Sequence, residues 1–315
     1  MDQSGIKDTI KNFCMILNNR RPALGVGCAS LGRNINHENT LNHDRDLLLK
    51  CYEAGFRYYD TSGAYGESEL SVGAFISEID RKSIFLATKS TLRQAGGFEM
   101  FKQNFYRSFD RLKTDYIDLF QIHDSDCYDI CTDEVIPFLI ERKKEKMICY
   151  TGFATRLLTA HSQAIADGFV DSVLSYLDYN LIKTSASHVI KQARKYNVAF
   201  INASVLLFGM MKNGLSSDEY VSARGQYKKR ILFAEEMMKL CDKMGINTIN
   251  ASLQYSLLNP DVDITLNGIK SINNLESTLN ALKNPLYPEE WAAISALQRT
   301  CPTIDIMDEP TYLFE

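Results

Sequence analysis

A carboxylate and a phenol stand close together in the stretch FRYYDTSGAYGESELSVGAFI, residues 56–76. Asp60 ends an apolar run, and Tyr65 follows it in the polar bend before the next apolar segment. Two further apolar runs end in the polar residues Lys89 and His123. A Tyr hydroxyl titrates near pH ~10 and is a poor acid–base catalyst at neutral pH, but an adjacent ammonium favours the phenolate and lowers that pKa. These residue types therefore fit proton-transfer chemistry.

The four side chains make chemical sense as one group. A carboxylate beside the lysine keeps the ammonium charged and directs it at the phenol, while an imidazole can donate a hydrogen bond to a substrate oxygen. Each residue also has an ordinary structural interpretation: Asp60 as a helix cap, Tyr65 as a loop aromatic, Lys89 as a solvated strand end and His123 as a core histidine. Their positions after neighbouring strands favour the catalytic interpretation, which is the interconversion of a carbonyl and an alcohol.

Strand-like and helix-like segments alternate along the whole chain. The predicted strands are residues 22–27, 56–60, 83–89, 115–123, 147–153, 170–178, 198–207 and 262–268. The predicted helices that follow them are residues 42–55, 67–79, 97–114, 132–146, 156–168, 185–197, about 228–244 and 271–282. Nearly continuous apolar strands that alternate with helices indicate a parallel sheet covered by helices.

Eight such units in one chain predict a closed (β/α)₈ TIM barrel, in the α/β class, rather than an open doubly wound sheet. No GxGxxG opens the first helix, which argues against a Rossmann domain. We expect one domain over residues 1–315, with additional terminal segments outside the barrel. These are the first twenty residues, where IKDTIKNFCMIL could form a short amphipathic helix, and residues 288–302. In such barrels the chemistry lies at the carboxyl ends of the strands.

Composition excludes several classes of protein. The net charge of −4 provides no basic field for a nucleic-acid backbone, so DNA and RNA are not expected as partners. No apolar run approaches the length of a membrane span, and the first residues lack the layout of a secretory signal. Eight cysteines scattered over 315 residues indicate reduced thiols rather than a disulfide framework. We therefore expect a cytoplasmic protein, a monomer or small homo-oligomer, that acts on a small molecule.

One cluster could instead hold a metal. The stretch HDSDCYDIC spaces His123, Cys127 and Cys131 four residues apart, with Asp126 and Asp129 between them. A zinc site would need a fourth ligand and would take His123 away from the proposed catalytic group. An ordinary barrel loop needs neither, so no metal is expected.

The stretches quoted above resemble the aldo-keto reductase superfamily from about residue 23 to about residue 282. The stretch 56–76 is similar to the signature of the family's second strand, with Asp60 and Tyr65 at its Asp and Tyr positions. IFLATKS supplies the family lysine as Lys89, and RLKTDYIDLFQIHD supplies the histidine as His123. The resemblance implies a nicotinamide cofactor, NADP or NAD, that lies across the barrel mouth, and hydride transfer to or from a carbonyl carbon.

The last strand and helix, VDITLNGIKSINNLESTLNAL, resemble the part of the family that holds the adenosine phosphate end of the cofactor. Lys270 and Ser271 could hold the 2′-phosphate of NADP, which slightly favours NADP over NAD, and Lys270 fits a solvated loop lysine equally well. The basic run 222–230 lies in the loop that folds over the pyrophosphate in the family, and it fits a solvated helix start equally well. The full set of implied cofactor contacts is Gly27, Cys28, Asp60, Thr155, Tyr176, Ser204, Leu206, Gly209, Gly268, Lys270, Ser271, Asn274 and Thr278.

Some positions depart from the common pattern of the family. Ala154 and Thr155 replace the usual Ser-Asn pair after the fifth strand, and Ala203 replaces the Tyr that often stacks on the nicotinamide. Ser175 and Tyr176 stand where a Gln is usual. These departures are similar to the aldose 1-dehydrogenase branch, which includes L-galactose, L-fucose and D-threo-aldose dehydrogenases. The branch implies oxidation of a sugar hemiacetal to a lactone.

Three other interpretations remain open from the sequence. The protein could bind a nicotinamide nucleotide as a regulatory subunit without turnover, or it could be a general aldehyde and ketone reductase. It could also be a barrel aldolase that forms a Schiff base through Lys89. The complete set of Asp60, Tyr65, Lys89 and His123 argues against lost catalysis, and a Schiff base would leave the pairing of Asp60 with Tyr65 unexplained.

Overall fold

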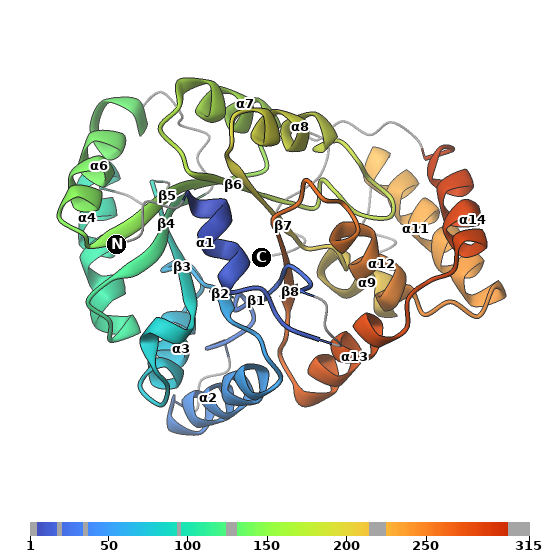
Figure 1. Ribbon diagram of the computed structural model, residues 1–315, viewed down its shortest axis with the longest axis horizontal. Helices are drawn as coiled ribbons and strands as arrows, with labels where there is room; N and C mark the ends of the chain where they lie inside the picture. The colour runs from blue at the N-terminus through green and yellow to red at the C-terminus, as the bar shows by residue number, and fades with distance from the viewer. Residues whose placement is uncertain are drawn as a thin grey trace.

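The described strands close into a parallel barrel in chain order, which confirms the predicted (β/α)₈ fold (Figure 1). The computed structural model describes residues 5–17, 21–33, 37–92, 96–123, 131–213 and 225–301. Strand β1 closes the barrel by pairing with β8, with Gly27 opposite Gly268. The strands are β1 (Leu24–Gly27), β2 (Tyr58–Asp60), β3 (Phe85–Thr91), β4 (Ile117–His123), β5 (Ile148–Ala154), β6 (Ser172–Tyr176), β7 (Ala199–Ala203) and β8 (Ile264–Gly268).

Helices follow the strands around the outside of the barrel. Those that cover it are α2 (His37–Glu53), α3 (Ser68–Ile76), α4 (Gly97–Leu112), α6 (Ile136–Lys144), α7 (Leu158–Asp167), α8 (Ser187–Lys195), α12 (Thr248–Leu257) and α13 (Ile272–Lys283). Short turns of 3₁₀ or π helix are η1 (Arg81–Ser83), η2 (Cys131–Val135) and η3 (Leu207–Gly209), and η3 leads into the single-turn α9 (Met210–Asn213).

Helix α12 is absent from the helices predicted above. The stretch from Asn247 to Asn250, where this helix begins, has the composition of a loop. In the structure the Asn247 side chain instead accepts hydrogen bonds from the backbone N–H groups of Ile249 and Asn250, and so caps the helix. The same residue types therefore start a helix here, because the side chain of Asn247 replaces the missing intrahelical acceptors.

Apolar side chains fill two layers of the barrel. Between the sheet and the helices, Phe75, Phe105 and Phe120 lie fully buried. Inside the barrel, Tyr58 stacks on Phe85 with ring centroids 4.9 Å apart. Both faces of each strand are thus covered, which explains why the strands read as nearly continuous apolar runs.

Helix α1 (Ile6–Asn12) covers the amino ends of the strands, where it lies across the barrel axis in Figure 1. Ile6 and Ile10 are buried in the same cluster as Tyr58 and Phe85. The hydroxyls of Thr9 and Tyr150 are hydrogen bonded over 2.6 Å. The predicted amphipathic segment therefore closes the amino end of the barrel, so a ligand must enter at the opposite, carboxyl end.

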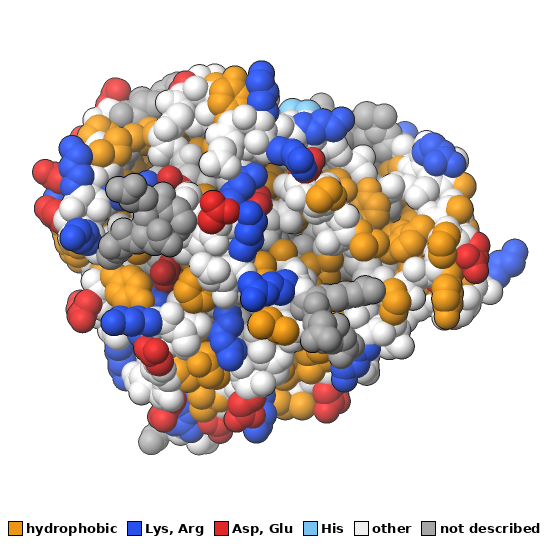
Figure 2. All heavy atoms as spheres, viewed as in Figure 1, with side chains coloured by type: hydrophobic (Ala, Val, Ile, Leu, Met, Phe, Trp, Pro, Cys, Tyr) orange, Lys and Arg blue, Asp and Glu red, His pale blue; other side chains and the backbone are white. Residues whose placement is uncertain are grey.

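Helix α14 (Pro288–Gln298) packs beside α11 (Gly225–Lys243) at the edge of the barrel (Figure 1). Met237 and Cys241 of α11 share a buried cluster with Ile294 of α14. On the face seen in Figure 2, cationic and anionic side chains are scattered among one another. Within the part of the chain that the structure describes, no helix is long and apolar enough to cross a membrane.

Candidate active site

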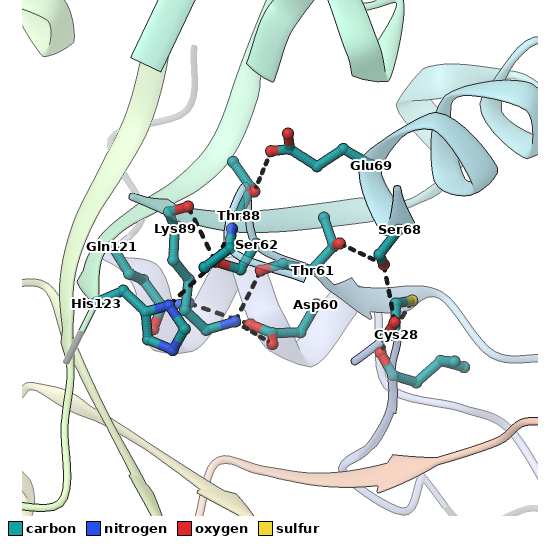
Figure 3. Close-up of polar contacts among 12 residues, drawn as sticks. Cys28, Asp60, Thr61, Ser62, Ser68, Glu69, Thr88, Lys89, Gln121 and His123 are labelled. Carbon is teal, nitrogen blue, oxygen red and sulfur yellow. Dashed lines mark hydrogen bonds and ion pairs between the residues drawn. The ribbon is translucent and has the colours of Figure 1, made fainter. Parts of the chain in front are cut away.

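An ion pair joins the carboxyl ends of β2 and β3 (Figure 3). Lys89 Nζ lies 2.5 Å from Asp60 Oδ1, and it also donates to the backbone oxygen of Thr61 over 2.8 Å. Both side chains are buried, with 1% of Lys89 and 5% of Asp60 exposed. Because a buried charge without a partner is costly, each of these residues depends on the other.

Strand β4 adds two inward-facing residues beside this pair. Gln121 stands opposite Lys89 in the register of β3 and β4, and its Nε2 donates to Asp60 Oδ2 over 3.1 Å. His123 lies two residues further along the same strand, so it points to the same side as Gln121. Gly152 of β5 makes room for the Gln121 side chain, because a Cβ at this position would lie 2.9 Å from Gln121 Cγ.

Burial and charge act against each other on Asp60. Burial raises the pKa of its carboxyl, and the ammonium of Lys89 and the amide of Gln121 oppose that rise. The carboxylate accepts from Lys89 on one oxygen and from Gln121 on the other. These hydrogen bonds fix the position of the Lys89 side chain next to Tyr65.

Tyr65 lies in the bend between β2 and α3. Its backbone N–H donates to Ser62, and its carbonyl accepts from the N–H of Ser68, so the bend is a compact turn that leads into the helix. The Tyr65 ring packs edge-on against the His123 ring, with centroids 5.4 Å apart. Lys89 Nζ is 5.0 Å from the centroid of the Tyr65 ring. The structure thus brings all four predicted catalytic residues together.

A cavity of about 580 Å³ opens over this cluster at the carboxyl ends of the strands. Asp60, Tyr65 and His123 line it. Lys89 is not among the described residues that line the cavity, which argues against a Schiff-base lysine. The predicted cofactor residues that line the same cavity are Gly27, Asp60, Tyr176, Ser204, Leu206, Gly209, Gly268, Lys270 and Asn274.

Four predicted cofactor residues lie outside that lining. Cys28 is fully buried beneath the end of β1. Thr155 uses its hydroxyl to accept from the backbone N–H of Leu157, and Ser271 caps helix α13. The buried hydroxyl of Thr278 bonds to the side chain of Asn267 and donates to the carbonyl of Asn274. In the structure these four side chains therefore support neighbouring backbone.

Sequence reasoning missed several polar residues of the site. Gln121 could have been found from its spacing, since it precedes His123 by two residues on one strand and so shares its face. Ser62 follows Asp60 at the same interval, and Arg156 comes directly after the predicted Thr155. Arg33, Arg156 and Asn267 all line the cavity. No local pattern distinguishes Arg33 or Asn267 from ordinary surface and strand residues.

Parts of two predictions lie outside the described residues. Asp126, Cys127 and Asp129 of the alternative metal cluster lie there, and so do residues 222–224 of the basic run. Over the residues that the structure does describe, no group of three or more His, Cys, Asp or Glu side chains could hold a metal ion. Arg230, the last residue of the basic run, is buried.

The model of the Aldo/keto reductase family matches residues 23–299. The chain belongs to this family. It is therefore an NAD(P)-dependent oxidoreductase that acts on carbonyl and alcohol groups. The matched range contains every strand of the barrel and all four of Asp60, Tyr65, Lys89 and His123.

Relatives within the aldo-keto reductases include two named sugar dehydrogenases. L-galactose dehydrogenase from Arabidopsis thaliana is 26% identical over 276 residues, which cover 84% of this chain and 83% of the relative. D-threo-aldose 1-dehydrogenase from a Pseudomonas species is 25% identical over 224 residues, 60% of this chain and 67% of the relative. An aldo-keto reductase structure from Bacillus halodurans, in its holo form, matches the fold with a TM-score of 0.75 at 23% identity and covers 94% of this chain and 98% of its own.

The residues of the cavity fit the nicotinamide nucleotide that aldo-keto reductases use. Gly27 and Gly268 stand side by side at the ends of β1 and β8, and a Cβ at Gly268 would meet no atom within 4 Å. Side chains therefore leave this part of the cavity open for a ligand. Lys270 and Asn274 line the cavity at the start of α13, where a helix N-terminus and a lysine suit a phosphate group.

Proposed function

We propose that this aldo-keto reductase is an aldose 1-dehydrogenase, which oxidises the anomeric carbon of a free sugar to a lactone. The observation that carries the proton-transfer part is the contact of the Tyr65 ring with both the Lys89 ammonium and the His123 ring, where Tyr65 and His123 line the cavity. The complete group argues for turnover rather than for nucleotide binding alone.

Tyr65 is the proposed general base for sugar oxidation and the general acid for the reverse reaction. Its phenolate takes the proton of the anomeric hydroxyl as the C1–O bond becomes a carbonyl, and the hydride leaves C1. When bound, the oxidised nicotinamide supplies the hydride acceptor. The positive charge of Lys89 favours the phenolate, and Asp60 holds that ammonium in place. His123 orients the substrate oxygen by a hydrogen bond.

Two features support a sugar substrate. Ala203 ends β7 with a small side chain on the cavity, where many members of the family have a Tyr. Tyr176 lines the cavity on the neighbouring strand, opposite Ala203 in the register. The two relatives named above as L-galactose dehydrogenase and D-threo-aldose 1-dehydrogenase point to the same class of substrate.

A panel of free aldoses and simple aldehydes, assayed in both directions with NADP and NAD, tests the proposal. We expect aldoses such as L-galactose or L-fucose to reduce the nucleotide and to yield the lactone, identified by mass spectrometry. Turnover of aromatic or aliphatic aldehydes alone, in the reductive direction, would replace the sugar proposal with that of a general aldehyde reductase.

We propose NADP as the preferred nucleotide, because Lys270 lines the cavity at the start of α13 and can pair with a 2′-phosphate. Lys270→Ala should weaken the binding of NADPH more than that of NADH in a fluorescence titration. Lys283→Ala is the matched control, since it removes a lysine from the last turn of α13, at the opposite end of that helix from Lys270. Equal weakening for both nucleotides would remove the assignment of Lys270 to the 2′-phosphate.

We also propose that residues 1–315 form one domain in the cytosol. Helix α1 shares a buried cluster with Tyr58 and Phe85 of the barrel, and α14 shares one with Met237 and Cys241 of α11. The cysteines whose side chains the structure describes are free thiols, which suits a reducing compartment. Limited proteolysis tests the first point, and fractionation of cells tests the second.

A further inference from the structure

Ser62 is hydrogen bonded to the imidazole ring of His123 (Figure 3). Its Oγ lies 3.0 Å from Nδ1 of His123, in a fully buried position between β2 and β4. His123 lines the cavity, and its other ring nitrogen points away from Ser62. The hydrogen bond at Nδ1 therefore affects which nitrogen carries the ring proton, because the partner of one imidazole nitrogen sets the tautomer.

The hydroxyl of Ser62 has one proton and several neighbours. It accepts a hydrogen bond from the backbone N–H of Ala64 over 3.1 Å. Its own proton can be donated to the Lys89 carbonyl, 3.2 Å away, or to His123 Nδ1 at 3.0 Å. A proton donated to the carbonyl requires Nδ1–H to be the donor toward Ser62, whereas a proton donated to Nδ1 requires that nitrogen to be bare.

The backbone allows Ser62 to donate to Nδ1. The Lys89 carbonyl already accepts a hydrogen bond from the N–H of Gly63 over 3.0 Å, so it is satisfied without the hydroxyl. A bare Nδ1 in this buried position needs a donor. Ser62 Oγ lies closer to Nδ1, at 3.0 Å, than to the Lys89 carbonyl oxygen, at 3.2 Å. Donation from Ser62 to Nδ1 therefore leaves neither the Lys89 carbonyl nor Nδ1 without a partner.

We propose that Ser62 is a positioning residue for His123: its hydroxyl donates to Nδ1 and holds the neutral ring with its proton on Nε2. The ring nitrogen on the cavity side is then an N–H donor without any net charge on the imidazole. A carbonyl oxygen can only accept, so this tautomer is the one that can orient such a substrate. The kinetic consequence rests on the function proposed above, but the tautomer itself does not.

Nuclear magnetic resonance of the protein with ¹⁵N-labelled histidine tests the tautomer directly. The chain has five histidines, and a His123→Asn variant identifies the signals of His123 by their loss. In the neutral ring we expect a pyridine-like shift for Nδ1 and a pyrrole-like shift for Nε2. A pyrrole-like Nδ1 in the wild-type protein would overturn the proposal, whatever the enzyme turns over.

Kinetics of Ser62 variants provide the second test. Ser62→Ala should mix the two tautomers and lower kcat about tenfold, the effect of one lost hydrogen bond, while the affinity for NADPH stays unchanged. Ser62→Thr keeps the hydroxyl and should restore the wild-type shifts. Ser71→Ala is the control, because it removes an equally buried hydroxyl that donates to Asp44 and does not line the cavity.

The possible outcomes separate the two proposals. Wild-type histidine shifts in Ser62→Ala would overturn the role of Ser62, even if kcat falls. The expected shifts combined with full activity of a Tyr65→Phe variant would leave Ser62 as the partner of His123 and would reject the proposed proton transfer.

Discussion

Lys89 Nζ donates to Asp60 Oδ1 over 2.5 Å, and this contact connects two neighbouring strands through two buried side chains. The same ammonium lies 5.0 Å from the centroid of the Tyr65 ring. One cation therefore links a structural carboxylate to the phenol proposed to transfer the proton. Variants of these residues should change stability and activity in different proportions.

Tyr65→Phe should lower kcat by roughly 10²- to 10⁴-fold, the range attributed to general acid–base catalysis. The substitution keeps the ring and its edge-on contact with His123, so folding and NADPH affinity should hardly change. Steady-state kinetics and a fluorescence titration measure the two quantities. Near-normal turnover would reject Tyr65 as the acid–base residue.

Lys89→Met should lower the free energy of unfolding by about 3–5 kcal/mol, because it leaves the buried Asp60 carboxylate without its cation. Urea denaturation measures this loss. The matched variant, Asp60→Asn with Lys89→Met, removes both charges and should recover part of the lost stability. Equal stability of the two variants would show that the uncompensated charge is not the cause.

The effects of Tyr65→Phe and Lys89→Met on kcat should not be additive. Both remove the same proton-transfer unit, so the double variant should be about as slow as the slower single variant. A double-mutant cycle on kcat measures the coupling. Fully multiplicative losses would mean that Lys89 acts independently of the Tyr65 hydroxyl.

Ile10→Ala should destabilise the protein by roughly 2–5 kcal/mol, the usual range for truncation of a buried Ile. Ile10 is 1% exposed where α1 closes the amino end of the barrel. Ile16→Ala is the control, since that side chain is 61% exposed and should contribute little. Thermal and urea denaturation compare the two. Similar effects would imply that α1 adds little to barrel stability.

The free energy of unfolding should decrease as the pH falls, because His161 is buried in its neutral form. Burial lowers the pKa of His161 from 6.5 to about 4, while its Nε2 contacts the Thr155 carbonyl over 2.9 Å. Between these two pH values the unfolded chain binds a proton that the folded protein does not, so unfolding is favoured as the pH falls. The contribution is about 3 kcal/mol at most.

Urea denaturation at several pH values between 7 and 4 tests this prediction. His161→Gln retains a donor for Thr155 but has no titrating ring, so it should show a shallower loss of stability than the wild type. The exposed His188→Gln variant should behave as the wild type does. An unchanged slope in His161→Gln would contradict the assignment.

The amino-acid sequence alone was sufficient to predict the barrel and its four central residues. Apolar strands and amphipathic helices repeat with local periods, so eight units could be recognised without knowledge of their contacts. Asp60 and Tyr65 lie in one short motif, and the carboxyl ends of parallel strands meet at one face, which brings Lys89 and His123 to them.

Only the tertiary structure decided which side chains contact each other around that group. Gln121 and Asp60 are 61 positions apart, as are Ser62 and His123, and both contacts depend on the register of β2, β3 and β4. The position of Thr278 behind Asn267, rather than in the cavity lining, likewise depends on how α13 packs on β8. Local sequence determines the period of an element, but the distance between two side chains depends on packing that no single segment contains.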